Sequence, residues 1–121
     1  MNMQGPVKRL SVYIGEVDTY DGKPLHEMLV EQARVAGVAG ATVLRGVAGF
    51  GATSREHARH GMRMSVDLPL VVTVIDSANR ITALAEVYSE MIGDGLITVE
   101  DVEVLVYRGG ITGGPGDAAA G

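Results

Sequence analysis

Residues 69–92, PLVVTVIDSANRITALAEVYSEMI, join a compact apolar run to an amphipathic helical pattern. Pro69 suits the first residue of a strand, and the compact apolar run Leu70 to Ile75 favours the strand itself. Asp76 and Ser77 are both good helix N-cap residues. The apolar side chains that follow recur at helical spacing: Ile81, Leu84, Ala85, Tyr88, Met91 and Ile92. The stretch therefore predicts a strand that passes directly into a helix packed by one face.

A second strand and helix are predicted nearer the N-terminus. Val7 to Ile14 alternates apolar and polar residues, which is typical of a half-buried strand. Pro24 suits the first helical position, because the N–H that a proline lacks would be unpaired there. Apolar residues then recur at helical spacing as far as Gly37, which offers a left-handed C-terminal cap.

Two further strands, over Ala41 to Val47 and Val99 to Tyr107, complete the order βαββαβ. This order is the ferredoxin-like plan, an α+β fold in which two helices cover one face of an antiparallel sheet. We expect it to form a single domain over residues 1–108. Residues 109–121 hold six glycines and a proline, so we expect this tail to be disordered.

The helix-free face of the predicted sheet is unusually apolar. If Leu70, Val72 and Val74 turn toward the helices, a second set of side chains turns away from them: Val71, Thr73, Ile75, Leu105 and Tyr107. An exposed apolar face of this kind usually marks a subunit interface, so the sequence predicts a homo-oligomer. The alternative is that the long loop before residue 69 folds back and covers the face.

Composition narrows the classes of function. The chain of 121 residues has no cysteine, which excludes disulfides, thiolate metal sites and a cysteine nucleophile. Its net charge of −5 argues against non-specific binding to nucleic acid. It has no long apolar run and no secretory pattern at the N-terminus, so we expect a cytoplasmic protein.

A glycine-rich loop is the candidate ligand site. Gly46 to Gly51, GVAGFG, holds three glycines in six positions, so its backbone N–H groups can approach an anion closely. Residues 55–63 hold three arginines and one glutamate and carry +2, so the rest of the chain carries −7. This local reversal of charge indicates an anion site at the loop.

Several motifs resemble those of a known family. GVAGATV at 37–43, GFG at 49–51 and IGDGLI at 92–97 resemble, in order and spacing, three signature stretches of the nitrogen regulatory protein PII. A closer resemblance is to the PII-like proteins catalogued as a domain of unknown function, DUF190. Their pattern of RGxxGFG, LSxDLP and GLVTxEDVEV looks like residues 45–51, 64–69 and 95–104. The resemblance covers residues 7–108.

The resemblance implies a homotrimer with inward-facing sheets and a nucleotide site in each cleft between neighbours. It implies a non-catalytic signalling protein whose mobile T-loop, here Ala52 to Asp67, docks onto a membrane transporter, a channel or an enzyme. The implied ligand-binding residues are Thr42 near the base, Arg45, Gly46, Gly49, Phe50 and Gly51 at the loop root, the phosphate-holding Gly93, Asp94 and Gly95, and Arg108. The implied partner-binding loop residues are Arg55, His57, Arg59, His60 and Arg63.

Departures from the PII pattern bear on the ligand. Leu96 stands where PII has a lysine, and Val104 and Val106 stand where it has two phosphate-gripping arginines. Each charge-assisted hydrogen bond contributes about 1.5 to 3 kcal/mol. Tight binding of ATP would therefore need a substitute cation: Arg9, Arg45, Arg55 or Arg108. An adenine nucleotide, or a less charged ligand, is expected. No tyrosine lies between positions 20 and 88, so control by nucleotidylation of the loop should be absent.

Two other interpretations were open. Glu56, His57 and His60 could share a metal on one helical turn, but solvated imidazoles are the commoner case, and we predict no metal. The chain could also be a small ferredoxin-like enzyme with His57 or His60 as general base in an intersubunit site. The sequence shows no nucleophile with a base and an orienting group, which favours the non-catalytic module.

Overall fold

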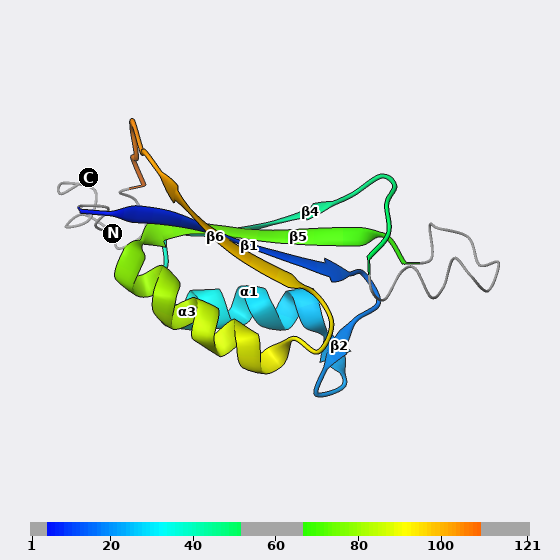
Figure 1. The fold of residues 1–121 in the computed structure, drawn as a ribbon. Helices are drawn as coiled ribbons and strands as arrows, with labels where there is room; N and C mark the ends of the chain where they lie inside the picture. Colours follow the sequence, from blue (N-terminus) through cyan, green and yellow to red (C-terminus); the bar gives the residue numbers. More distant parts are fainter. Residues whose placement is uncertain (1–4, 52–66, 110–121) are drawn as a thin grey trace.

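The computed structural model describes residues 5–51 and 67–109 (Figure 1). Its elements in chain order are β1 (Val7–Gly15), β2 (Thr19–Tyr20), β3 (Lys23–Pro24), α1 (Leu25–Ala36), β4 (Ala41–Arg45), β5 (Pro69–Ser77), α3 (Ala78–Met91) and β6 (Leu96–Val102). The predicted βαββαβ order is present, with a short β2–β3 hairpin added before α1. The T-loop and tail predicted from the sequence lie outside the described residues, apart from Asp67 and Gly109.

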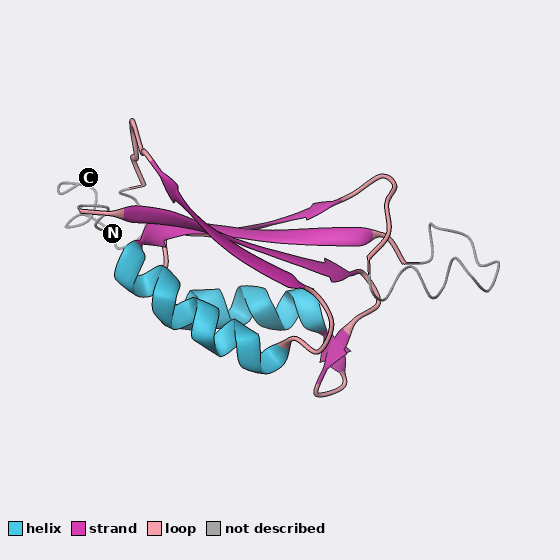
Figure 2. Cartoon of the chain, viewed as in Figure 1, coloured by secondary structure: helices cyan, strands magenta, loops and turns pink. Residues whose placement is uncertain are grey.

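Four strands form one antiparallel sheet in the order β4-β5-β1-β6. Both helices cover the same face of this sheet, and the described chain leaves the other face without a helix (Figure 2). The two central strands, β5 and β1, are joined to each other and to one edge strand each. This is the ferredoxin-like fold, as the sequence predicted.

The core lies between the sheet and the two helices. Alternate residues of the central strands point into it, because side chains on a strand alternate between its faces. The buried side chains are Leu10, Val12 and Ile14 from β1, Leu70, Val72 and Val74 from β5, Leu25, Leu29 and Ala33 from α1, and Ile81, Leu84, Tyr88 and Met91 from α3. Burial of each of the larger ones stabilises the fold by roughly 1.5 to 3 kcal/mol.

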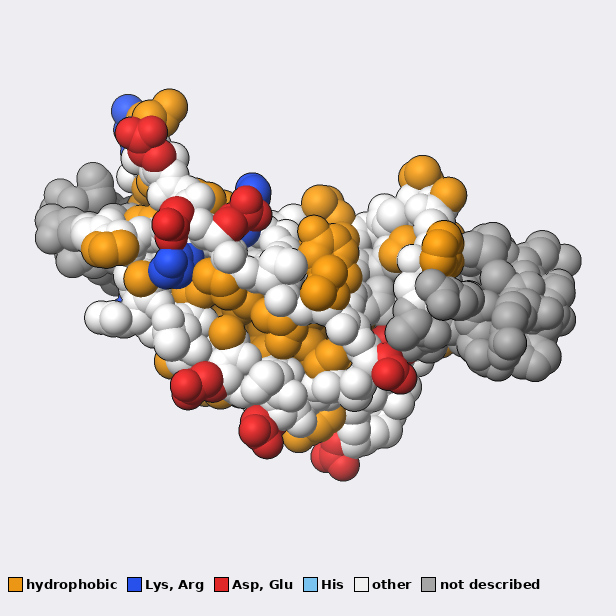
Figure 3. Space-filling view, viewed as in Figure 1, with side chains coloured by type: hydrophobic (Ala, Val, Ile, Leu, Met, Phe, Trp, Pro, Cys, Tyr) orange, Lys and Arg blue, Asp and Glu red, His pale blue; other side chains and the backbone are white. Residues whose placement is uncertain are grey.

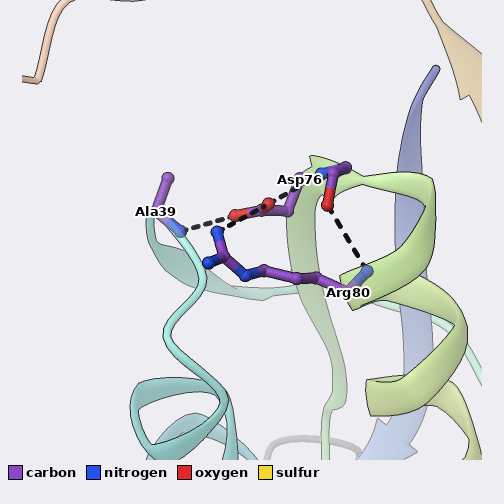
Figure 4. Close-up of polar contacts among 4 residues, drawn as sticks. Ala39, Asp76 and Arg80 are labelled. Atoms are coloured by element: carbon purple, nitrogen blue, oxygen red, sulfur yellow. Dashed lines mark hydrogen bonds and ion pairs between the residues drawn. The ribbon is translucent and has the colours of Figure 1, made fainter. Parts of the chain in front are cut away.

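A buried carboxylate fixes the junction of β5 and α3 (Figure 4). Asp76 is fully buried, and its oxygens accept hydrogen bonds from the backbone N–H of Ala39 at 2.8 Å and of Ser77 at 2.7 Å. Arg80 lies 3.7 Å from the same carboxylate. Ser77 caps α3 by accepting from the N–H of Arg80, as predicted. Asp76 therefore ties the loop before β4 to the start of α3.

The start of α1 differs from the prediction by one position. Pro24 is the N-cap residue, with ψ of 127°, and not the first helical residue. Its extended conformation follows from its pairing with Thr19 in the β2–β3 hairpin. The other end agrees with the prediction, because Gly37 has φ of 79° and its N–H bonds back to the last turn.

The two edge strands end earlier than predicted. β6 covers residues 96–102 and not 99–107, because its partner β1 begins at Val7, which pairs with Val102. Leu105 and Tyr107 therefore lie beyond the end of β6 and are not residues of the sheet. β4 ends at Arg45 and not at Val47, where the glycine loop leaves the sheet.

The helix-free face carries rows of side chains that cross the strands. The rows in register are Leu44–Val71–Tyr13–Leu96, Thr42–Thr73–Ser11–Thr98, Ile75–Arg9–Glu100 and Ser77–Val7–Val102. The first row is apolar and partly exposed, the second is made of hydroxyls, the third contains an ion pair, and the fourth includes the buried Val7. The large exposed apolar side chains of this face therefore lie at one end of the sheet, next to the glycine loop.

Candidate functional site

The two glycine segments predicted to bind the ligand lie at the same end of the sheet but at opposite edges. The loop over residues 46–51 follows β4, whereas the turn over residues 93–95 precedes β6. β5 and β1 lie between these edge strands. Three strand spacings of about 4.8 Å put the two segments roughly 14 Å apart within one chain. The two predicted ligand-binding segments are therefore separated within a single chain.

The glycine loop is packed over the start of β5. The Gly46 N–H donates to the carbonyl of Pro69 at 2.7 Å, and a Cβ at Gly46 would lie 2.8 Å from the Pro69 ring. Gly49 has φ of 146°, a conformation that side chains rarely permit. Val47 and Phe50 are largely exposed, and Figure 3 shows hydrophobic side chains on this loop. The loop presents backbone and apolar groups outward from a fixed base.

Arg45, at the end of β4, already holds a carboxylate. Its guanidinium forms an ion pair with Glu16, which directly follows β1. The Arg45 side chain is 60% exposed and that of Glu16 is 26% exposed. The structure therefore places an internal anion on the arginine that the sequence assigned to the ligand.

Asp67, beside the candidate site, has a structural role that the sequence did not indicate. Assigned to the end of the T-loop, it is buried, and one of its oxygens accepts from the Val17 N–H at 3.2 Å. The Glu16 N–H donates to the carbonyl of Leu68 at 2.8 Å. A Cβ at Gly15 would lie 2.8 Å from the Asp67 carboxylate. Gly15 and Asp67 are far apart in the sequence, so only the tertiary structure could show that they are in contact.

The second predicted ligand-binding segment is the turn between α3 and β6. A Cβ at Gly95 would lie 2.8 Å from the carbonyl oxygen of Tyr13, so β1 itself requires a glycine there. At Gly93 a Cβ would meet nothing within 4 Å, so its surroundings leave room for a ligand. Asp94 is exposed between them, and Leu96, in place of the PII lysine, is 56% exposed.

Thr42 lies apart from both glycine segments, in a cavity of about 340 Å³ on the helix-free face. The cavity is lined by Ala39, Gly40, Thr42, Thr73, Ile75, Val104, Val106 and Tyr107. Val104 and Val106, which replace the two PII arginines, thus contribute apolar walls. Thr42 and Thr73 face each other in the register of β4 and β5 and supply hydroxyls.

The other arginines named as substitutes for the missing PII cations differ in whether they already have a partner. Arg9 donates from Nε and Nη2 to Glu100, at 2.9 and 2.8 Å, so a ligand would have to break this pair. Arg108 is exposed and has no ion pair within the described residues. Arg55 lies outside them, as do the other predicted partner-binding residues: His57, Arg59, His60 and Arg63.

Within residues 5–51 and 67–109, no three His, Cys, Asp or Glu side chains are grouped so that they could hold a metal ion. No helix in this part of the chain is both long enough and apolar enough to span a membrane.

The sequence is similar to those of one protein family and of its relatives in other organisms. Residues 7–104 match the family DUF190, described as "Uncharacterized ACR, COG1993". A UPF0166 protein of Aquifex aeolicus (strain VF5) is 41% identical over 102 residues, which are 81% of this chain and 92% of that protein. A UPF0166 protein of Methanocaldococcus jannaschii is 31% identical over 104 residues, which are 84% of this chain and 93% of that protein.

The fold is similar to that of CPII from Thiomonas intermedia K12, a nitrogen regulatory PII-like protein whose structure holds ADP, AMP and bicarbonate. The TM-score is 0.56 at 20% identity, over 83% of this chain and 96% of that chain. At this sequence identity the similarity shows a shared fold and nothing further.

Proposed function

The chain belongs to the DUF190 family, and on that premise we propose that it is a non-catalytic PII-like regulatory protein that binds an adenine nucleotide between subunits. The observation that carries the proposal is the placement of two glycine segments at one end of the sheet, on its two edges. Exposed backbone N–H groups at such bends suit phosphate oxygens. The adenine nucleotides and bicarbonate bound by CPII, which shares the fold, support this ligand class.

The proposed assembly is a homotrimer in which the helix-free sheet faces turn inward. The apolar row Leu44–Val71–Tyr13–Leu96 supports it, because Leu44, Tyr13 and Leu96 are each about half exposed in the single chain. A cyclic arrangement brings the β4 edge of one protomer toward the β6 edge of the next. Such a contact would unite the two predicted ligand-binding segments that one chain keeps apart.

The cavity beside Thr42 is the proposed binding position for the uncharged part of the ligand. Its walls include Ile75, Val104 and Val106, and its polar groups include the hydroxyls of Thr42 and Thr73. An adenine base suits such a lining, since it is flat and apolar with hydrogen-bonding edges. In this proposal the phosphates lie toward the glycine segments, and Arg45 supplies a cation that compensates in part for the missing PII cations.

The regulatory output is proposed to pass through the predicted T-loop, with its cluster of arginine and histidine side chains, to a transporter, channel or enzyme in the cytoplasm. Ligand binding would shift the populations of loop conformations, which the partner would distinguish. The described residues on either side of the loop support this. Arg45, at the end of β4, and Asp67 and Leu68, before β5, all contact Glu16 or Val17.

A calorimetric titration tests the proposal. The protein is titrated with ATP, ADP, AMP and cyclic AMP, each with and without bicarbonate, and every mixture is then analysed for reaction products. Saturable binding without turnover is expected. Absence of binding across the panel would contradict nucleotide sensing, and product formation lost in His57→Ala or His60→Ala would favour the enzyme alternative.

A further inference from the structure

Glu16 occupies the position that an anionic ligand would need. The segment that follows β1 places the Glu16 carboxylate on the Arg45 guanidinium, at the root of the glycine loop. Arg45 is thus shown to be an anion-binding position, and its present occupant comes from the chain itself.

Two hydrogen bonds to the segment before β5 hold the backbone of Glu16 in this position. The Glu16 N–H donates to the Leu68 carbonyl at 2.8 Å, and the next N–H, of Val17, donates to buried Asp67 at 3.2 Å. A third bond, from the Gly46 N–H to the Pro69 carbonyl at 2.7 Å, fixes the residue after Arg45. The two partners of the ion pair are therefore presented to each other by ordered backbone, and the carboxylate cannot move far away.

The pair is well placed to be replaced. The Arg45 side chain is 60% exposed, and ion pairs of such exposure are weak because water screens them. A phosphate group carries more charge than a carboxylate and can accept two parallel hydrogen bonds from a guanidinium. A phosphate can therefore displace Glu16, whereas a singly charged carboxylate gains little by doing so.

We propose that Glu16 is a specificity-determining residue that competes with the ligand for Arg45 and thereby excludes weakly charged anions. This inference rests on the proposed function for the identity of the ligand as a nucleotide. The competition itself does not depend on the proposed function, because any multiply charged phosphate that binds Arg45 must displace Glu16. Removing the carboxylate should strengthen anion binding, which is the opposite of the result expected for a residue that merely supports the site.

The test compares Glu16→Gln with Glu86→Gln, an exposed position on α3 that undergoes the same change of charge. Calorimetry with ADP should show roughly two- to fivefold tighter binding for Glu16→Gln, the range that weak surface ion pairs allow. Glu86→Gln should remain within the error of the wild type. In an Arg45→Ala background, Glu16→Gln should have no effect. Unchanged or weaker binding in the single variant would overturn the competition and leave the proposed function standing.

A second measurement does not depend on nucleotide binding. Titration with pyrophosphate, followed through the NMR signal of Arg45 Nε–H, should reach half-saturation at a lower concentration in Glu16→Gln than in the wild type. If ADP does not bind but pyrophosphate behaves in this way, the proposed function fails and the competition holds. If the Arg45 signal does not respond in either protein, the competition is refuted.

Discussion

Tyr88 shows how a single residue links the two helices through the core. Its side chain is fully buried, and its hydroxyl donates to the Leu29 carbonyl of α1 at 2.6 Å. Tyr88→Phe removes this bond and should lower the free energy of unfolding by about 1 kcal/mol. Urea denaturation at pH 8 measures the difference, and an unchanged midpoint would contradict the expected contribution of the hydroxyl.

The same residue makes stability depend on alkaline pH. Burial raises the pKa of the Tyr88 phenol, so above pH 10 the unfolded chain releases this proton more readily than the folded one. The stabilisation is fully present below about pH 10 and is lost as the pH rises further. The unfolding free energy of the wild type should therefore fall more steeply between about pH 10 and 11.5 than that of Tyr88→Phe. Parallel urea curves for the two proteins across this range would show that the difference lies elsewhere.

Glycines at the candidate site fall into two kinds. Gly95 is required by the fold, because a Cβ there would meet the Tyr13 carbonyl at 2.8 Å, whereas a Cβ at Gly93 or Gly51 would meet nothing within 4 Å. Gly95→Ala should therefore destabilise the protein itself. Gly93→Ala and Gly51→Ala should keep the melting temperature of the wild type and weaken ADP binding about tenfold, by blocking one or two hydrogen bonds to backbone N–H groups. Wild-type affinity in both would remove these glycines from the ligand site.

At the scale of elements, Asp76 joins three parts of the fold. Asp76→Ala leaves the partly buried N–H groups of Ala39 and Ser77 without this acceptor, so the loss should be on the order of 2 to 4 kcal/mol. Asp101→Ala is a matched control, because Asp101 is an exposed strand residue that forms a surface ion pair with Lys8, and its loss should be within about 0.5 kcal/mol. Urea denaturation distinguishes the two. Equal losses would show that Asp76 does not anchor these elements.

The sequence predicted those elements whose periodic patterns of apolar residues are local. The alternation in β1 and the helical spacing in α3 are local, and both were confirmed. The end of β6 could not be predicted, because the alternation continues to Tyr107 while the partner strand stops at Val7. The extended conformation of Pro24 likewise depends on its pairing with Thr19.

The candidate site was predictable only in part for the same reason. Glycine content identified the loop and the turn, but their separation by β5 and β1 is a property of the sheet order. The contacts of Glu16 with Arg45 and of Asp67 with Val17 join residues 29 and 50 positions apart. No pattern within a short window of sequence could have paired them.

At the scale of the whole molecule, the helix-free face can be tested as a subunit interface. Val71 lies in its apolar row, so Val71→Glu should disrupt the proposed trimer by placing a charge in the interface. Val35→Glu is the control, because Val35 lies on α1 and is 72% exposed. Sedimentation velocity should give the mass of three chains for the wild type and the control, and of one chain for Val71→Glu. A monomeric wild type would refute the interface and the shared site together.

The separation of the two predicted ligand-binding segments at opposite edges of the sheet has a genetic consequence. In a ring, a variant damaged only on the β4 side, such as Gly51→Val, and one damaged only on the β6 side, such as Gly93→Val, each impair every crevice of their own rings, for different reasons. Mixed assemblies of the two would contain crevices built from the intact side of each, about one quarter of the total if mixing is random. Two such defective alleles expressed in one cell would then partly complement each other, and each defective copy mixed with wild-type copies would remove only one crevice from its ring.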